Sequence, residues 1–310
     1  MTPLWIFEAL GCVLGLLFGS FLNVCISRIP EGRSVVKPRS RCPQCSAPIR
    51  WYDNIPVLSW LLLKGRCRDC QRAIPLRYPF VEIALALWFM GVIFYCWPVG
   101  SATQISMEAY ASLILTGISL AILGFLLIGL MVMDWQTMLL PDAFTLTGIA
   151  ISFVLISVRA LFLQGAEDQI ILNPTHQLHL NGPGSSDSPG DVFLTGPEHM
   201  IGVWFVAVLG AAALLLAIRW LYKTVRHREG MGLGDVKLIA LIAAFLGFWP
   251  ALLSLFLGVV TASVYAIVLL VRGRAGGTTR LAFGSFLCAG GLISALFGNR
   301  LIEIYASLLH

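Results

Sequence analysis

Residues 230–248 read GMGLGDVKLIALIAAFLGF, a glycine-rich turn followed by one carboxylate and an apolar run. Glycine at positions 230, 232 and 234 allows backbone conformations and close approaches that other residues do not. Asp235 stands at the edge of the apolar run, and an ionisable residue at the edge of hydrocarbon indicates a functional site. The structural alternative is that Asp235 is only the N-cap of the helix that follows.

The composition around this stretch indicates a protein embedded in a membrane. Of the 310 residues, 58% are hydrophobic and only 12% are charged, against about 25% charged residues in soluble domains. A spanning helix needs about 20 apolar residues. Such runs occur at residues 4–26, 80–97, 111–133, 144–163, 201–222, 236–248, 251–271 and 283–304. We therefore predict an all-α polytopic membrane protein of about eight transmembrane helices, in which the short run 236–248 and its successor form a tight hairpin around Pro250.

The distribution of basic residues predicts the orientation of these helices. Residues 28–77 hold eleven Lys and Arg, and residues 223–228 and 272–280 are also basic, whereas residues 164–200 hold none and contain five acidic residues. With eight spans, the three basic loops fall on one side and the acidic loop on the other. Lys and Arg favour the cytoplasmic side. We expect cytoplasmic basic loops, a periplasmic loop at 164–200 and both termini outside.

Two C-x-x-C pairs lie in the first basic loop, at Cys42 and Cys45 and at Cys67 and Cys70. Two such pairs, here separated by 21 residues, are typical of a tetrahedral zinc site with four sulfur ligands. Disulfides are the alternative, but they would need an oxidising compartment, which the basic loop argues against. We predict a small zinc-ribbon-like domain with structural zinc and a core formed by Trp51, Ile55, Val57, Leu58, Trp60 and Leu61.

A second carboxylate, Asp134, falls at the end of the third span. Two spans separate it from Asp235, so both acids return to the same face of the membrane. Two such carboxylates can hold a water between them, one removing its proton while the other protonates a peptide carbonyl. Asp142 is a rival, but it follows Pro141 at a predicted helix start, where an acid is ordinary. We expect Asp142 to be structural.

These motifs together resemble the type IV prepilin peptidases. The resemblance rests on residues 19–24 (GSFLNV) with 28–30 (RIP), the cysteine pairs, residues 77–82 (RYPFVE), Asp134 with 140–142 (LPD), residues 232–237 (GLGDVK) and residues 283–286 (FGSF). It implies an intramembrane aspartic protease with Asp134 and Asp235 as the catalytic pair. Two departures are a longer acidic loop at 164–200 and Ser285, where the family often has proline.

The resemblance also implies the substrates. A prepilin or pseudopilin with a short basic leader would be cut after glycine, and its new N-terminus would be methylated from S-adenosylmethionine. The first cytoplasmic loop would house methyl transfer, with Tyr78 and Glu82 as candidate residues, although Glu82 could equally be a helix-start acid. Asn23 would contact substrate or bridge helices. Gly232, Gly234 and Lys237 would support the substrate or the dyad, with lipid phosphate as an alternative partner of Lys237.

The predicted organisation is a first transmembrane helix at 1–27, a zinc-binding loop domain at 28–79 and a peptidase domain at 80–310, in a bacterial inner membrane with the active site cytoplasmic. Expected partners are pilins and membrane lipid, not nucleic acid. Because Asp235 opens a helix and Asp134 closes one, the helix dipoles suggest Asp235 as the anionic base and Asp134 as the acid. The alternatives are another Gly-x-Gly-Asp protease without methyltransferase activity, a non-enzymatic assembly factor, or a proton-coupled transporter.

Overall fold

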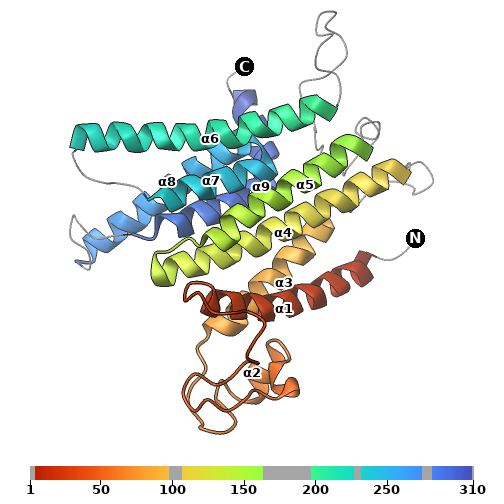
Figure 1. The fold of residues 1–310 in the computed structure, drawn as a ribbon, viewed down its shortest axis with the longest axis vertical. Helices are drawn as coiled ribbons and strands as arrows, with labels where there is room; N and C mark the ends of the chain where they lie inside the picture. Colours follow the sequence, from red (N-terminus) through yellow and green to blue (C-terminus); the bar gives the residue numbers. More distant parts are fainter. Residues whose placement is uncertain (1–3, 98–106, 163–196, 227–231, 274–280, 309–310) are drawn as a thin grey trace, which may run out of the picture.

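A computed structural model describes residues 4–97, 107–162, 197–226, 232–273 and 281–308 (Figure 1). Its elements are α1 (Leu4–Arg28), η1 (Trp51–Asn54), α2 (Leu58–Leu62), α3 (Arg77–Tyr95), α4 (Met107–Thr137), α5 (Asp142–Phe162), α6 (Pro197–Arg226), α7 (Leu233–Leu246), α8 (Phe248–Val271) and α9 (Phe283–Leu308). Each predicted apolar run falls largely within one helix, and the described residues contain no β-strand beyond isolated bridges. The all-α prediction is confirmed.

Six of these helices are long and apolar enough to cross a membrane, namely α1, α3, α4, α5, α6 and α8. Helix α7 has 14 residues, about 21 Å at 1.5 Å per residue, which is short of a hydrocarbon core of about 30 Å. In α9 the described residues Phe283–Gly298 form a shorter apolar stretch. Helices α7 and α8 do form the predicted close pair, but the break is at Gly247, with φ of 89°, and not at Pro250. A count of eight spans stays a prediction.

Helices α1 and α3 pack closely because glycines on α1 face the α3 backbone. A Cβ atom at Gly15 would lie 2.5 Å from Cα of Ala86, and one at Gly19 would lie 2.6 Å from Cα of Glu82. Small residues at such contacts let membrane helices approach closely. The pair forms one side of the molecule, and α6 lies on the opposite side (Figure 1).

Helix α4 lies between these groups and contacts α1, α3, α5, α7 and α9. Next to it, α7 is buried on nearly all sides from Leu238 to Ala244. A helix that is apolar all round is one that other helices surround. The first turn of α7, which carries Asp235, is therefore held by its neighbours.

The cysteine loop projects from the α1 and α3 side (Figure 1). Its two C-x-x-C turns share one conformation: Cys42 N–H donates to Ala47 O, and Cys67 N–H to Arg72 O, both at 2.9 Å. Each turn is flanked by one antiparallel bridge, at positions 41 and 48 and at 66 and 73. The loop thus contains a local structural repeat that the sequence analysis did not find.

The predicted core of this loop is wrong for most of its members. Trp51 is 82% exposed, Leu61 59% and Leu58 50%. Trp60 is half-buried, with its Nε1 donating to Ile74 O at 3.2 Å and its ring against Gly65. The loop is held by turns and an Arg68–Asp53 ion pair more than by apolar burial. The predictions for the acidic loop and for two of the basic segments fall partly outside the described residues. The residues concerned are 163–196, 227–231 and 274–280.

Candidate active site and cysteine centre

Asp235 lies in the first turn of α7 with its side chain buried. Gly232 precedes the helix in an extended conformation, and its N–H donates to Oδ2 of Asp235 at 3.2 Å. Asp235 is therefore not the N-cap residue, but it reaches back to satisfy an amide that the helix leaves unpaired. The amide contact leaves the second carboxyl oxygen without a hydrogen bond among the described residues.

Asp134 lies in the last turn of α4 and is also buried, with 5% of its surface exposed. Its Oδ2 accepts hydrogen bonds from Ser285 N–H at 2.7 Å and from Ser285 Oγ at 3.0 Å. Ser285 belongs to the first turn of α9, so the Asp134 carboxylate lies at the N-terminus of that helix. The expectation that its surroundings are those of a helix C-terminus alone is wrong, because α9 supplies the opposite end of a dipole.

One leucine side chain joins the two acidic turns. A Cβ atom at Gly234 would lie 3.1 Å from Cδ1 of Leu140, and one at Gly284 would lie 3.0 Å both from that atom and from Oδ2 of Asp134. Leu140 therefore touches both acidic turns, and both carboxylates are buried. Two acids a hundred positions apart in the sequence thus lie in the same buried neighbourhood.

Lys237 and Asp142 pair with each other. Lys237 Nζ lies 2.6 Å from Oδ1 of Asp142 and so connects α7 to the start of α5. Both side chains are partly exposed, and such a pair contributes about 0–1 kcal/mol to stability. This contact agrees with a structural role for Asp142, and it gives Lys237 a partner other than the dyad or a lipid phosphate.

The four cysteines of the loop form a group that can hold a metal ion. Their Sγ atoms all lie within 4.8 Å of one another, and those of Cys42 and Cys70 are 3.9 Å apart. A tetrahedral zinc site with Zn–S bonds of about 2.3 Å holds its sulfur atoms about 3.8 Å apart. The backbone N–H of Cys45 lowers the pKa of Cys42 to about 7, which favours the thiolate that a metal needs. The group therefore fits zinc.

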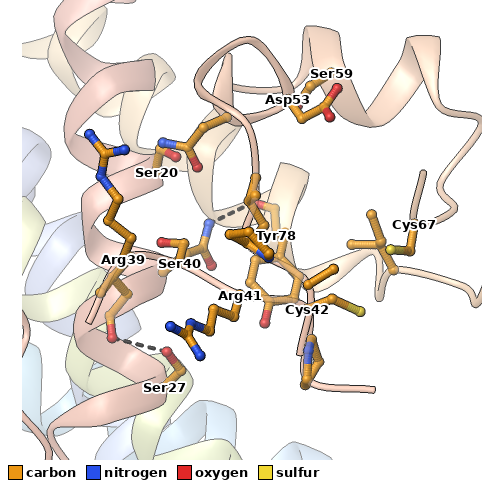
Figure 2. A pocket seen from close by; sticks show the side chains of 18 of the residues that line it. Ser20, Ser27, Arg39, Ser40, Arg41, Cys42, Asp53, Ser59, Cys67 and Tyr78 are labelled. Atoms are coloured by element: carbon orange, nitrogen blue, oxygen red, sulfur yellow. Dashed lines mark hydrogen bonds between the residues drawn. The ribbon is translucent and has the colours of Figure 1, made fainter. Parts of the chain in front are cut away.

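A cavity of about 680 Å³ lies between this centre and the ends of α1 and α3 (Figure 2). Its walls include Arg39, Ser40 and Arg41 from the loop and Tyr78 from α3. Pockets for ligands of drug-like size usually measure about 300–1,000 Å³. The volume and the mixed polar lining therefore suit a nucleoside-sized molecule.

Glu82 lies in the second turn of α3, is buried and lines this cavity. Helix α3 begins at Arg77, three residues earlier than the predicted run, so Glu82 is not a helix-start acid. Its Oε2 accepts a hydrogen bond from Val57 N–H at 2.7 Å. Asn23 bridges α1 and α3 through a 3.0 Å hydrogen bond to Tyr78 O, as one of its two sequence interpretations expected.

Ser285 is the main residue at the acidic site to which the sequence analysis assigned no role. It was noted only as a departure from the family pattern, although a serine in the first turn of a helix is a good partner for a buried carboxylate. Its contact with Asp134 depends on where α9 packs, and residues 134 and 285 are far apart in sequence.

Comparison with known families identifies two regions of the chain. Residues 13–96 match the bacterial peptidase A24 N-terminal domain, and residues 192–267 match the type IV leader peptidase family. The first region includes both cysteine pairs, Tyr78 and Glu82. The second includes Asp235 and its glycines, and Asp134 lies between the two matches.

Full-length relatives agree with these matches. The chain is 34% identical to the prepilin leader peptidase/N-methyltransferase of Pseudomonas putida, over 99% of this chain and 95% of the relative. It is 32% identical to the protein of that name from Aeromonas salmonicida strain A449, over 98% and 95%, and 34% identical to that of Myxococcus xanthus, over 86% and 64%. No solved structure matches this chain.

Proposed function

The chain belongs to the type IV leader peptidase family and is a multi-pass membrane enzyme, and we propose that it cleaves prepilins or pseudopilins and methylates the product. In this proposal the short basic leader is removed after a glycine. Asp134 and Asp235 perform the cleavage. The observation that carries the assignment is the burial of both carboxylates in one neighbourhood, each at the N-terminus of a helix.

Cleavage needs one carboxylate as base and the other as acid, acting on a water and a peptide carbonyl. The helix dipoles no longer distinguish the two, because α7 and α9 both direct their N-termini at a carboxylate, each effect being worth about 0.3–1 kcal/mol. The hydrogen bonds do distinguish them. Asp134 accepts two from Ser285 and Asp235 accepts one from Gly232.

Each hydrogen bond to a charged group contributes about 1.5–3 kcal/mol, more than either dipole. We therefore assign Asp134 as the ionised base and Asp235 as the protonated acid, the reverse of the assignment that the sequence suggested. Gly232 and Gly234 leave the approach to Asp235 free of side chains. An extended substrate could lie along this turn and pair with its backbone groups.

The cavity between α1, α3 and the cysteine loop is the proposed place of methyl transfer. When bound, S-adenosylmethionine supplies an activated methyl group. Arg39 and Arg41 on the cavity wall suit its carboxylate, and the volume suits its adenosine. Zinc bound by Cys42, Cys45, Cys67 and Cys70 would hold the wall in place, and four sulfur ligands leave it no open position for catalysis.

Sidedness follows from charge. The three basic segments are assigned to the cytoplasm of a bacterial inner membrane, and both termini to the outside. This arrangement brings the dyad, the cysteine centre and the leader to one face. A proton-coupled transporter is less well supported, since its acids belong near the midplane on interrupted helices, whereas Asp134 and Asp235 lie in helix end turns.

A direct assay tests the proposed function. Purified protein in detergent is incubated with a full-length prepilin, with and without S-adenosylmethionine, and the product is weighed by mass spectrometry. We expect leader loss in both reactions and one added methyl group only with S-adenosylmethionine. Cleavage without methylation would support a protease-only relative, and an unchanged substrate mass would reject the peptidase.

A further inference from the structure

The cavity is lined by a buried carboxylate that forms no ion pair with any residue the structure describes. Glu82 is 7% exposed, and the groups that act on its carboxyl are the Val57 amide and the side chains of Ser20 and Asn23. None of these is positively charged. The cavity's Arg28 is occupied elsewhere, donating to Ser34 O and Pro38 O at 3.0 and 2.8 Å. The described neighbours of this buried carboxyl are therefore neutral donors, and none of them offsets a negative charge on it.

A second unsatisfied acceptor lies next to it. Asn23 is 3% exposed, and its Oδ1 has no hydrogen-bond partner within the part of the chain that the structure describes. Its Nδ2 is fixed by Tyr78 O, which orients the amide group. Nearly all buried polar atoms are paired, so an orphaned oxygen in a cavity wall indicates a missing donor.

The chain is strained where it meets Glu82. Val57 has φ of 58°, a conformation that β-branched residues rarely adopt, while its N–H donates to Oε2 of Glu82. Strained residues concentrate at functional sites. Three neutral donors reach the Glu82 carboxyl, and a carboxylate has about four acceptor sites, so it keeps room for one more donor. Asn23 Oδ1 is the second acceptor left for a ligand.

We propose that Glu82 and Asn23 bind the new N-terminal ammonium of the cleaved chain, so that they form the acceptor site for methyl transfer. The inference rests on the proposed function. A primary ammonium carries one positive charge and three N–H donors, which matches one carboxylate with one amide oxygen. The α-ammonium of S-adenosylmethionine has the same chemistry and is the alternative source.

The proposal gives Glu82 a second task. The N-terminal ammonium, with an ordinary pKa near 7.7–8.0, must lose one proton before its nitrogen has a free electron pair. Glu82 accepts that proton. The nitrogen then forms a bond to the methyl carbon of the sulfonium donor, the carbon–sulfur bond breaks, and its electron pair stays on sulfur as a neutral thioether. The product is a methylammonium that carries the positive charge.

The fold connects this site to the dyad. Arg77, next to Tyr78 in the first turn of α3, donates to the side chain of Gln136, two residues beyond Asp134. Arg77 therefore joins the first turn of α3, which also carries Tyr78 of the cavity wall, to the last turn of α4.

The test uses purified full-length protein, the variant Glu82→Gln and the control Asp69→Asn. The glutamine keeps an acceptor for Val57 N–H and removes the charge, and Asp69 is an exposed carboxylate on the same cavity. A peptide with the mature pilin N-terminus is offered with a free or an acetylated amine. We measure peptide binding, methylation with S-adenosylmethionine, and leader cleavage.

The free-amine peptide should bind the wild type and Asp69→Asn more tightly than the acetylated peptide. Glu82→Gln should remove that difference and lower methylation about 10²-fold or more, while cleavage stays within about 2-fold. Equal binding of both peptides by the wild type would overturn the proposal without any variant. So would retained methylation in Glu82→Gln.

Binding of S-adenosylmethionine separates the two sources of ammonium. If Glu82→Gln lowers the affinity for S-adenosylmethionine and leaves the preference for the free-amine peptide intact, the site belongs to the donor and the proposal is wrong. If the wild type cleaves prepilin but never methylates it, the proposed methyltransferase function fails first. By contrast, a wild type that methylates its product but binds the free-amine and acetylated peptides equally would reject only the ammonium site.

Discussion

The backbone N–H and the hydroxyl of Ser285 both donate to Oδ2 of Asp134, at 2.7 and 3.0 Å, and so join the last turn of α4 to the first turn of α9. The hydroxyl has one proton, which it shares between Asp134 Oδ2 and Met131 O at 2.9 Å. Ser285 thereby fixes one carboxylate of the proposed dyad in position and favours its ionised form. Several predicted effects depend on this contact or on the close packing around it.

Ser285→Ala should slow leader cleavage by about 10-fold or more. The change removes one hydrogen bond to a charged group, worth about 1.5–3 kcal/mol, and keeps the backbone N–H. The rate of cleavage of a purified prepilin measures the effect. Ser294→Ala is the matched control, because Ser294 is a buried serine on α9 that donates to Pro250 O. An equal loss in both variants would show that Ser285 acts only through the packing of α9.

Gly284→Ala should also impair cleavage. Its Cβ atom would lie 3.0 Å from Oδ2 of Asp134, so the carboxylate or Leu140 must move, and overpacking of this kind costs about 1–3 kcal/mol. We expect a loss of about 10-fold in cleavage rate with normal expression. Gly202→Ala, where no atom lies within 4 Å of the new methyl group, should cleave as the wild type does. A fully active Gly284→Ala protein would contradict the geometry given for the dyad.

Gly19→Ala is expected to separate the two activities. The new methyl group would lie 2.6 Å from Cα of Glu82, and the backbone of α3 cannot yield as a flexible side chain can. Displacement of α1 from α3 should disturb the cavity and lower methylation of a pre-cleaved pilin more than it lowers leader cleavage. Gly91→Ala, with only an ordinary contact at 3.9 Å, serves as the control. Equal losses of both activities in Gly19→Ala would argue against separate sites.

Zinc should copurify at about one ion per chain. Cys42→Ser and Cys67→Ser, each removing one ligand, should lose the metal and most methylation, since the cysteine loop forms a wall of the cavity. Cleavage should persist. Protons compete with zinc for the thiolates, so zinc should leave when the pH is lowered far enough. Metal analysis after desalting at several pH values measures zinc loss. A metal-free protein that methylates as the wild type does would refute the structural role of zinc.

The sequence alone was sufficient to predict the helices and the cysteine centre. Runs such as 111–133 are long and uniformly apolar, and residues 42, 45, 67 and 70 have a spacing that few other structures share. The number of predicted spans between Asp134 and Asp235 is two, which correctly predicted that the two acids lie close together. These features depend on local composition and spacing, which a single sequence records.

Contacts between distant segments could not be predicted in this way. The approach of α9 to Asp134 is the reason why we propose the opposite assignment of acid and base, because the dipole argument considered only the helix to which each residue belongs. The same limit applies to Lys237, whose partner Asp142 is 95 positions away. The prediction of the buried core in the cysteine loop failed for another reason. When turns and metal ligands fix a small domain, apolar residues such as Trp51 need not be buried.

The most direct test of the dyad measures leader cleavage by Asp134→Asn and Asp235→Asn, each purified in detergent and assayed with full-length prepilin. The amides preserve shape and remove the ionisable oxygen. Both variants should release no leader, yet still methylate a pilin that has already been cut. Substantial leader release by either variant would contradict the assignment of these two residues as the catalytic pair.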